Sequence, residues 1–283
     1  MSVRSREFRL KGAKCMRNRY LPFASYNLWS LFSPAVGKEA FHCAMKRGFL
    51  KARKNETAIS ALMKQDTVAQ QIGHLTQYGI YEFHRNASFL TSVEGVEAVA
   101  ELLKLEREDI KVRTRVLQIL HNYQADPISP EKEILQLLRG DEKWPDPILM
   151  SQSGYQFNLY AAFDCVLHEL DGTIHILDFK TGKSDFDRRQ AYVYLLAAQH
   201  IYPNKKAVAS FYNVESGSRS PLITATKSQL EAVKIELMRI SQRHQRDLSL
   251  YRQRPHDFSY VFSPAVGPAC KFCLFNSICD FSL

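Results

Sequence analysis

The stretch YQFNLYAAFDCVLHELDGTIHILDFKTG, residues 155–182, holds two β-rich runs separated by Asp171-Gly172. An Asp-Gly turn between two such runs predicts an antiparallel hairpin. Because residues i and i+2 of a strand point to the same face, Asp178 and Lys180 project together from the second run. Asp164, on the first run, can lie opposite them if the strands pair.

Two carboxylates beside a lysine make a poor apolar core and a good site for a divalent cation. Mg²⁺ prefers oxygen ligands and keeps positions for water and phosphate. Lys180 can then orient or deprotonate an attacking water and offset the charge that develops on phosphorus. A lone Asp-x-Lys is more often an exposed ion pair on an edge strand, so the hypothesis depends on the residues around it.

The residues after the hairpin continue an α/β pattern. We expect a helix from about 185 to 200, strands over 206–214 and 220–226, and a long polar helix over about 228–251. Gln190 and Tyr194 are four residues apart on the first helix, so they share a face and could hold a substrate strand beside the metal site. An ordinary helix with a polar flank is the simpler alternative.

The residues before the hairpin predict a mainly helical region. Apolar residues recur at helical spacing through 57–140, and a loop, GDEKWPDP at 140–147, ends the region. His74 lies next to the stripe of Val68, Ile72 and Leu75, where a single histidine is more often structural than a ligand. The chain thus divides into a helical region (57–145), a catalytic core (148–225) and a C-terminal part (226–283).

One nucleotide-binding motif can be rejected. TGKS at 181–184 matches the end of the phosphate-binding pattern G-x4-GK[ST], but the first glycine would have to stand at Leu177, inside a predicted strand. We expect no NTP-binding loop here, although Lys183 could contact a nucleic-acid phosphate.

The composition indicates which kinds of partner the chain could bind. The chain has 283 residues, 45% hydrophobic and 24% charged, with a formal net charge of +9. Such a balance suggests a polyanionic partner, or serves solubility alone. No apolar run approaches the roughly 20 residues of a membrane helix, so no membrane association is expected. Residues 1–20 form a basic arm with one acid, Glu7. We expect a cytoplasmic protein, although this start is equally typical of an organelle presequence.

Three cysteines gather at the C-terminus, in CKFCLFNSIC at 270–279. Six cysteines in a chain of this length do not suggest a disulfide framework, so the trio predicts a metal site that lacks a fourth ligand. Three buried thiols are the alternative. The hexapeptide FSPAVG stands upstream of this trio, at 262–267, and also at 32–37, upstream of Cys43. Two similar loops that border one metal site would fit this identity.

The order His74, Asp164, Asp178-x-Lys180, Gln190-x3-Tyr194 resembles the RecB-type branch of the PD-(D/E)xK nuclease superfamily. The closing C-x2-C-x5-C resembles the iron–sulfur subgroup of that branch, which includes the AddB nuclease domain and the CRISPR-associated iron–sulfur exonucleases. The resemblance covers about 25–279 and is most specific over 157–194 and 255–279. Two positions depart from the family pattern: Ala161 replaces a common glycine, and Ala44 replaces the usual proline after the first cysteine.

The resemblance implies a restriction-endonuclease-like α/β core, with a mixed central sheet flanked by helices, a helical N-terminal part and a C-terminal Fe–S clasp. A single nuclease domain over 21–283 would follow the arm. It also implies a deoxyribonuclease that uses Mg²⁺ or Mn²⁺. His74, Asp164 and Asp178 would hold the metal with the carbonyl of Phe179. Lys180 would position the water, and Gln190 and Tyr194 the DNA strand.

The same resemblance implies a [4Fe–4S] cluster held by Cys43, Cys270, Cys273 and Cys279. Cys15 is the rival for Cys43, and Cys165 is a weaker one. The implied function is exonuclease action on single-stranded DNA ends in repair or recombination, with a helicase or recombination partner. A nucleic-acid-binding subunit without hydrolysis and a structural zinc site remain the alternatives.

Overall fold

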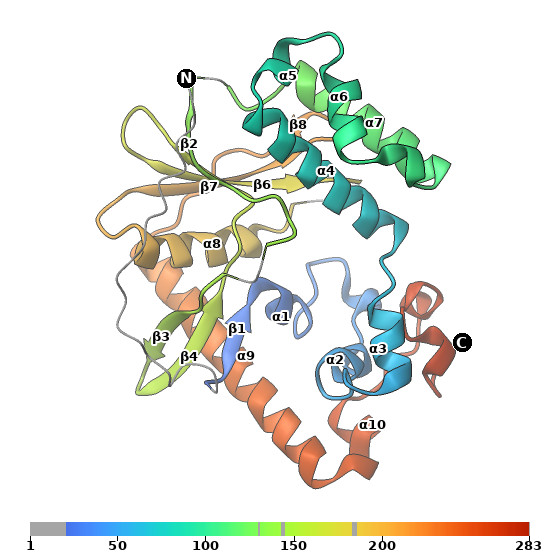
Figure 1. The fold of residues 1–283 in the computed structure, drawn as a ribbon. Coiled ribbons are helices and arrows are strands. Elements are labelled where there is room, and N and C mark those ends of the chain that lie inside the picture. The colour runs from blue at the N-terminus through green and yellow to red at the C-terminus, as the bar shows by residue number, and fades with distance from the viewer. Residues whose placement is uncertain (1–20, 130, 143–144, 183–185, 283) are drawn as a thin grey trace.

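The centre of the fold is a mixed five-stranded sheet in the order β2-β5-β6-β7-β8. The computed structural model describes residues 21–129, 131–142, 145–182 and 186–282 (Figure 1). The strands are β2 (Glu133–Leu137), β5 (Cys165–His168), β6 (Ile174–Lys180), β7 (Ala207–Asn213) and β8 (Ser218–Arg219). Among the described strands of this sheet, β6 and β7 pair in parallel and the other neighbours are antiparallel. The sheet confirms the predicted mixed α/β core.

The predicted hairpin is the β5–β6 pair. Cys165 pairs with Leu177 and His168 with Ile174. Gly172 in the turn has φ +81°, in the left-handed region that a side chain disfavours. Asp164 stands directly before β5, so the end of the hairpin places it beside the C-terminal half of β6.

Three sequence-based boundaries were wrong. The run 155–170 divides into β4 (Tyr155–Tyr160) and β5, which lie in different sheets. The two strands are separate because the chain leaves β4 at Ala161, and Phe163 then packs edge-on against Tyr194. Residues 220–226 make only an isolated bridge, Ile223 to Ala209. The predicted helical region ends instead in β2, which pairs with β5.

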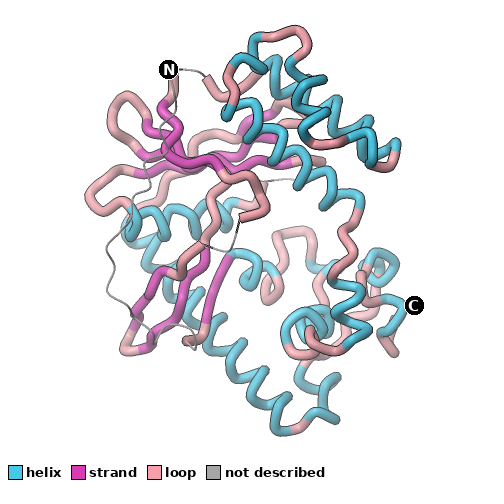
Figure 2. Tube along the Cα trace, in the orientation of Figure 1, coloured by secondary structure: helices cyan, strands magenta, loops and turns pink. Residues whose placement is uncertain are grey.

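The second sheet has three strands in the order β1-β4-β3. It consists of β1 (Phe23–Ser25), β4 and β3 (Ile148–Gln152), with β1 and β4 parallel. It joins the segment after residue 20 to the middle of the chain, and Figure 2 shows it beneath the larger sheet.

Helices cover both faces of the larger sheet. Ile174 and Ile176 of β6 face α8 (Arg188–Ile201) and α9 (Lys227–Gln253), whereas Leu177 and Phe179 face the opposite helices. That second layer contains α4 (Val68–Arg85), α5 (Ser88–Thr91), α6 (Gly95–Leu102) and α7 (Ile110–Ala125). The alternation along β6 therefore sends Asp178 and Lys180 toward α8 and Phe179 toward α4.

The N-terminal and C-terminal parts of the described chain lie side by side (Figure 1). We call residues 31–51 and 258–282 together the clasp. It contains α2 (Ala44–Lys51), α10 (Phe258–Val261) and three short 3₁₀ turns: η2 (Glu39–Phe41), η5 (Pro268–Phe272) and η6 (Asn276–Ile278). Met45, Phe49 and Phe275 of the clasp, together with Ile59 from the helix that follows α2, form a buried cluster that we call the clasp core. The helix α1 (Tyr26–Ser30) precedes the clasp, α3 (Thr57–Met63) follows α2, and η4 (Pro255–Asp257) leads into α10.

No helix in the described ranges is long and apolar enough to cross a membrane. The basic arm at 1–20, with Cys15, lies outside the described residues, as does Lys183.

Candidate active site

The side chain of Asp178 is fixed at the centre of a polar network between β6 and α8. Its residue is 2% exposed. Its Oδ1 accepts hydrogen bonds from Tyr194 Oη at 2.6 Å and from Gln190 Nε2 at 2.9 Å. Gln190 Nε2 also lies 2.6 Å from Tyr194 Oη. The two α8 residues share one face, as expected, and their polar atoms hold this carboxylate.

Lys180 completes the network from the same face of β6. Its Nζ lies 2.5 Å from Asp178 Oδ2 and donates to Gln190 Oε1 at 3.0 Å. Asp178 Oδ2 is buried and, among the described residues, has this ion contact but no hydrogen bond. The Lys180 ammonium is thus the partner of this buried oxygen, and a carboxylate oxygen with one such partner still has a lone pair that a divalent cation can take.

Asp164 supplies the second carboxyl group. Its Oδ2 accepts the backbone N–H of Phe179 at 2.9 Å, which ties the residue to β6. Burial, and then the nearby carboxylate of Asp178, raise the pKa of Asp164 to about 8. Two carboxyl groups that oppose each other's ionisation are stabilised by a cation between them, so the donors fit Mg²⁺ or Mn²⁺.

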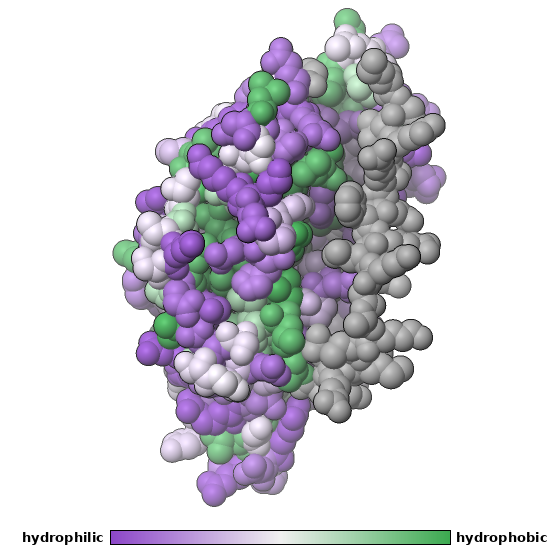
Figure 3. Space-filling view, turned by 90° about the vertical axis from the view of Figure 1, so that its left-hand side faces the viewer, coloured by the Kyte–Doolittle hydropathy of each residue, from purple (hydrophilic) through white to green (hydrophobic). Residues whose placement is uncertain are grey.

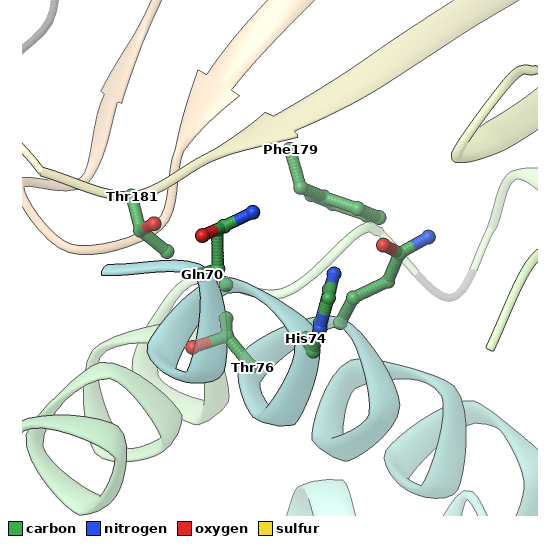
Figure 4. A pocket seen from close by; sticks show the side chains of 7 residues that line it. Gln70, His74, Thr76, Phe179 and Thr181 are labelled. Atoms are coloured by element: carbon green, nitrogen blue, oxygen red, sulfur yellow. The ribbon is translucent and has the colours of Figure 1, made fainter. Parts of the chain in front are cut away.

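His74 lies on the other side of β6, in a pocket of about 240 Å³ between α4 and the end of the strand. Figure 4 shows its ring projecting from α4 toward β6, which carries Phe179. The side chain is 61% exposed, and its Nδ1 lies 3.6 Å from Asp66 Oδ2. Within the described ranges, no three His, Cys, Asp or Glu side chains lie close enough to hold one metal ion. The structure therefore brings the two aspartates together and leaves His74 apart from them.

Gln77 contacts the site, although it is not among the residues predicted from the sequence. Its Nε2 lies 3.4 Å from both Asp164 Oδ1 and the carbonyl oxygen of Leu138. Gly140 has φ +100°, and a Cβ there would stand 3.0 Å from Gln77 Oε1. Gln77 is three residues after His74 on α4, so the helical period could have indicated it.

The four cysteines of the predicted iron–sulfur site lie in the clasp. Cys43, Cys273 and Cys279 pack against the clasp core. Cys43 Sγ accepts the backbone N–H of Ala265 at 3.4 Å. Thiolates suit iron or zinc, but no three of these sulfurs are gathered in the described structure. Burial raises the pKa of the Cys165 thiol in β5, so Cys165 is a poor ligand.

The similarity between the two copies of the hexapeptide continues beyond the six identical residues. In FSPAVGKEAFHC and FSPAVGPACKFC the sixth residue after the glycine is a cysteine, Cys43 or Cys273. Both copies also contain a 3₁₀ turn before that cysteine, η2 or η5, and the two turns pack together. The glycines differ in backbone conformation, with φ +79° at Gly37 and 175° at Gly267. The copies therefore correspond in side-chain placement rather than in every dihedral angle.

Both copies contact one buried arginine. The guanidinium of Arg47 lies over the rings of Phe32 and Phe262, at 4.0 and 4.9 Å from their centroids. Arg47 is 2% exposed, and its Nη2 donates to Asp247 Oδ2 of α9 at 2.8 Å. The repeat thus has a physical role, because its two phenylalanines hold the same cation from the two parts of the clasp.

The comparison with protein families agrees with this site. The sequence model of the PD-(D/E)XK nuclease superfamily matches residues 34–280. No curated protein matches the sequence significantly. A solved structure titled "Crystal structure of SSO0001" is 12% identical and matches 85% of this chain and 95% of its own, with a TM-score of 0.29. That value carries no structural argument. The family match spans most of the chain and includes both aspartates and Lys180, so the chain belongs to the PD-(D/E)XK nuclease superfamily.

Proposed function

We propose that the chain is a metal-dependent deoxyribonuclease of the RecB-type branch, an exonuclease that acts on single-stranded DNA ends in repair or recombination. Superfamily membership supports a nuclease that uses Mg²⁺ or Mn²⁺. The observation that carries the proposal is Asp178, held on Oδ1 by α8, with Asp164 and Lys180 beside it. A structural ion pair would not need a second carboxyl group with a raised pKa at the same place.

In this proposal Asp164 and Asp178 would hold the metal with the carbonyl of Phe179, and His74 would become a further ligand only after its side chain moved from its present position toward the two aspartates. When bound, the metal would lower the pKa of a water, so that hydroxide is available to attack phosphorus, and it would screen the charge of the phosphate. Gln190 and Tyr194 fix the Asp178 carboxylate in one orientation. Lys180 stands beside that carboxylate, where its ammonium can orient the water and neutralise the charge of the transition state.

Digestion of end-labelled DNA tests the activity. Wild type, Lys180→Ala and the control Lys205→Ala are incubated with single-stranded DNA, double-stranded DNA and RNA in Mg²⁺, Mn²⁺ or EDTA. Release of label from single-stranded DNA by wild type and Lys205→Ala, and not by Lys180→Ala or in EDTA, supports the proposal. Binding without cleavage by wild type would instead support the non-hydrolytic subunit.

We also propose that Cys43, Cys270, Cys273 and Cys279 hold a [4Fe–4S] cluster. The equivalent positions of Cys43 and Cys273 in the repeat, and the contact of three of the cysteines with the clasp core, support Cys43 as the fourth ligand. The donors would have to move closer together than they are here. Iron, sulfide and zinc analysis of protein purified without oxygen, with its visible absorption, separates the cluster from a zinc site.

The remaining expectations follow from the same family likeness. We propose one nuclease domain over 21–283 after a basic arm, in a cytoplasmic protein that works with a helicase or recombination partner. Limited proteolysis that stops at one fragment beginning near residue 21 would support the domain, and copurification from native cells would test the partner.

A further inference from the structure

The second half of α9 is unusually basic. From Leu237 to the end of the helix and its cap the chain has five exposed arginines: Arg239, Arg243, Arg246, Arg252 and Arg254. Within the described part of the chain, none of the five forms an ion pair with an acidic side chain. The acid in this half, Asp247, is buried against Arg47. The first half is different, since Lys234 pairs there with Glu231.

Three of these arginines lie on one face of the helix. Arg239, Arg243 and Arg246 are at positions i, i+4 and i+7, whereas the buried residues Ile240 and His244 are on another face. We call these three the α9 arginine stripe. At a rise of 1.5 Å per residue their Cα atoms span about 10 Å along the axis. Arg243 is further anchored over the ring of Phe32, 5.3 Å from its centroid.

The stripe does not resemble a face that serves solubility alone. Like charges at i and i+4 destabilise a helix, and a solvated face normally intersperses acids that relieve this. An anionic ligand would offset the repulsion. Arginine binds phosphate through two parallel N–H donors, which lysine cannot do. A DNA strand places one phosphate about every 3.4 Å along the duplex axis, so the length of the stripe covers about three phosphate intervals and each arginine can reach a different phosphate.

We propose that the α9 arginine stripe is a second nucleic-acid contact surface, which binds the phosphate backbone of a strand outside the active site. The inference rests on the proposed function for its ligand, and it concerns a different part of the molecule. In Figure 1 the first half of α9 lies beside α8, and the second half extends to the bottom of the molecule. The lower part of the face in Figure 3 presents mainly hydrophilic side chains. A strand would have to extend beyond the catalytic residues to reach the stripe.

A matched pair of triple variants tests the stripe. One variant is Arg239→Gln, Arg243→Gln and Arg246→Gln. The control is Lys104→Gln, Arg107→Gln and Lys111→Gln, which removes the same charge near α6 and α7, at the opposite end of the molecule in Figure 1. Binding of fluorescent single-stranded DNA, short and long, is measured in EDTA over a range of salt concentrations.

The stripe variant should bind long DNA at least about tenfold more weakly than the control does. Its plot of log affinity against log salt should be less steep by about 2, because three phosphate contacts are lost at about 0.7 each. Short DNA that fits only the active site should bind both variants alike. Equal binding of long DNA by the two variants, or an equal loss in both, would overturn the proposal.

Two further measurements keep the result clear. Arg239→Gln with Arg246→Gln leaves the contact of Arg243 with Phe32 in place, and it should lose affinity for long DNA even if the triple variant folds poorly. Since binding is measured without metal, a Lys180→Ala variant that still cleaves DNA would overturn the proposed function and not the stripe.

Discussion

The polar network of the active site comes from residues 178–194, whereas the clasp joins segments about 200 residues apart, and the two regions differ in how far the chain alone completes them. In the active site Asp178, Lys180, Gln190 and Tyr194 already hydrogen-bond or pair with one another. In the clasp Cys43, Cys273 and Cys279 pack against one apolar core, and in the described structure no three cysteine sulfurs are close enough to hold one metal ion.

The supporting elements explain this difference. The catalytic side chains stand on β6 and α8, whose backbones are fixed by strand pairing and by apolar packing. Cys270 lies in a 3₁₀ turn, Cys273 and Cys279 directly follow such turns, and Cys43 stands between the turn η2 and the first residue of α2. Such turns hold their side chains weakly, because few hydrogen bonds fix them. A site on turns therefore needs its ligand to complete it, as metal-coupled folding requires.

The largest expected effect concerns the cysteines. Cys43→Ala and Cys273→Ala should lose iron to the same extent and lower the melting temperature equally, because the repeat gives the two residues equivalent places. Cys165→Ala should keep its iron, since that thiol is buried in the sheet. Iron content and thermal melting of variants prepared without oxygen give the answer.

Cys15→Ala is the control for the fourth ligand. If it loses iron while Cys43→Ala keeps it, the rival ligand is correct and the equivalence of the repeat is wrong. If every variant and the wild type lack iron and zinc, the clasp contains ordinary thiols.

The next effect concerns the carboxylates. Asp178→Asn and Asp164→Asn should each lower cleavage by a factor on the order of 10³ or more, comparable with the removal of a strong electrostatic group from an active site. The melting temperature should change far less than it does in the cysteine variants, because the network around Asp178 keeps its shape. Near-normal cleavage by either variant would remove the metal assignment.

A smaller effect tests whether the clasp is held together without metal. Arg47→Met should destabilise the chain by about 3–5 kcal/mol, because it leaves Asp247 as an uncompensated buried charge. The loss should be the same with and without bound metal. Arg53→Met is the control, since its partner Glu56 is exposed and such pairs contribute about 0–1 kcal/mol. Chemical denaturation measures the free energy of unfolding of both variants. Equal losses would show that the buried pair of Arg47 with Asp247 contributes no more to stability than an exposed pair does.

Sequence reasoning succeeded where a short-range pattern determines the structure. The Asp171-Gly172 turn, the alternation along β6 and the four-residue spacing of Gln190 and Tyr194 predicted which side chains meet. It failed where contacts between segments far apart in the sequence determine the structure. Nothing local in residues 155–170 indicates that Tyr160 ends a strand of one sheet and Cys165 begins a strand of the other. The edge strand β2 forms because β5 offers free backbone groups.

The same limit applies to individual side chains. The exposure of His74 depends on how α4 rests against β6, and Gln77 reaches Asp164 because Gly140 leaves room for it. The role of the repeat needs Arg47 and Asp247, which are 200 residues apart. The hexapeptide was visible in the sequence, and so was the equal spacing to its cysteines, but the shared cation was not.

The smallest effect is a pH dependence of stability. One contribution should come from a histidine beside the clasp and another from a histidine behind the larger sheet. Burial lowers the pKa of His244 to about 4, with Arg47 and Lys51 adding to the effect, and His244 packs edge-on against Phe32 beside the clasp. Burial alone lowers the pKa of His84 to about 4, where its ring contacts Tyr123 behind the sheet. In the unfolded chain both would titrate near 6.5. The unfolded state therefore binds more protons between about pH 6.5 and 4, and stability should fall as the pH falls through this range.

Replacing each histidine separates the two contributions. His244→Phe and His84→Phe should each flatten the fall of the melting temperature over that range, since neither phenylalanine takes up a proton. Hydrogen exchange can then localise the effect. In wild type at pH 5, amides of α2 and the second half of α9 should lose protection, and in His244→Phe they should keep it while those around Tyr123 do not. If His244→Phe leaves the slope of melting temperature against pH unchanged, the stability of the clasp does not depend on a neutral histidine.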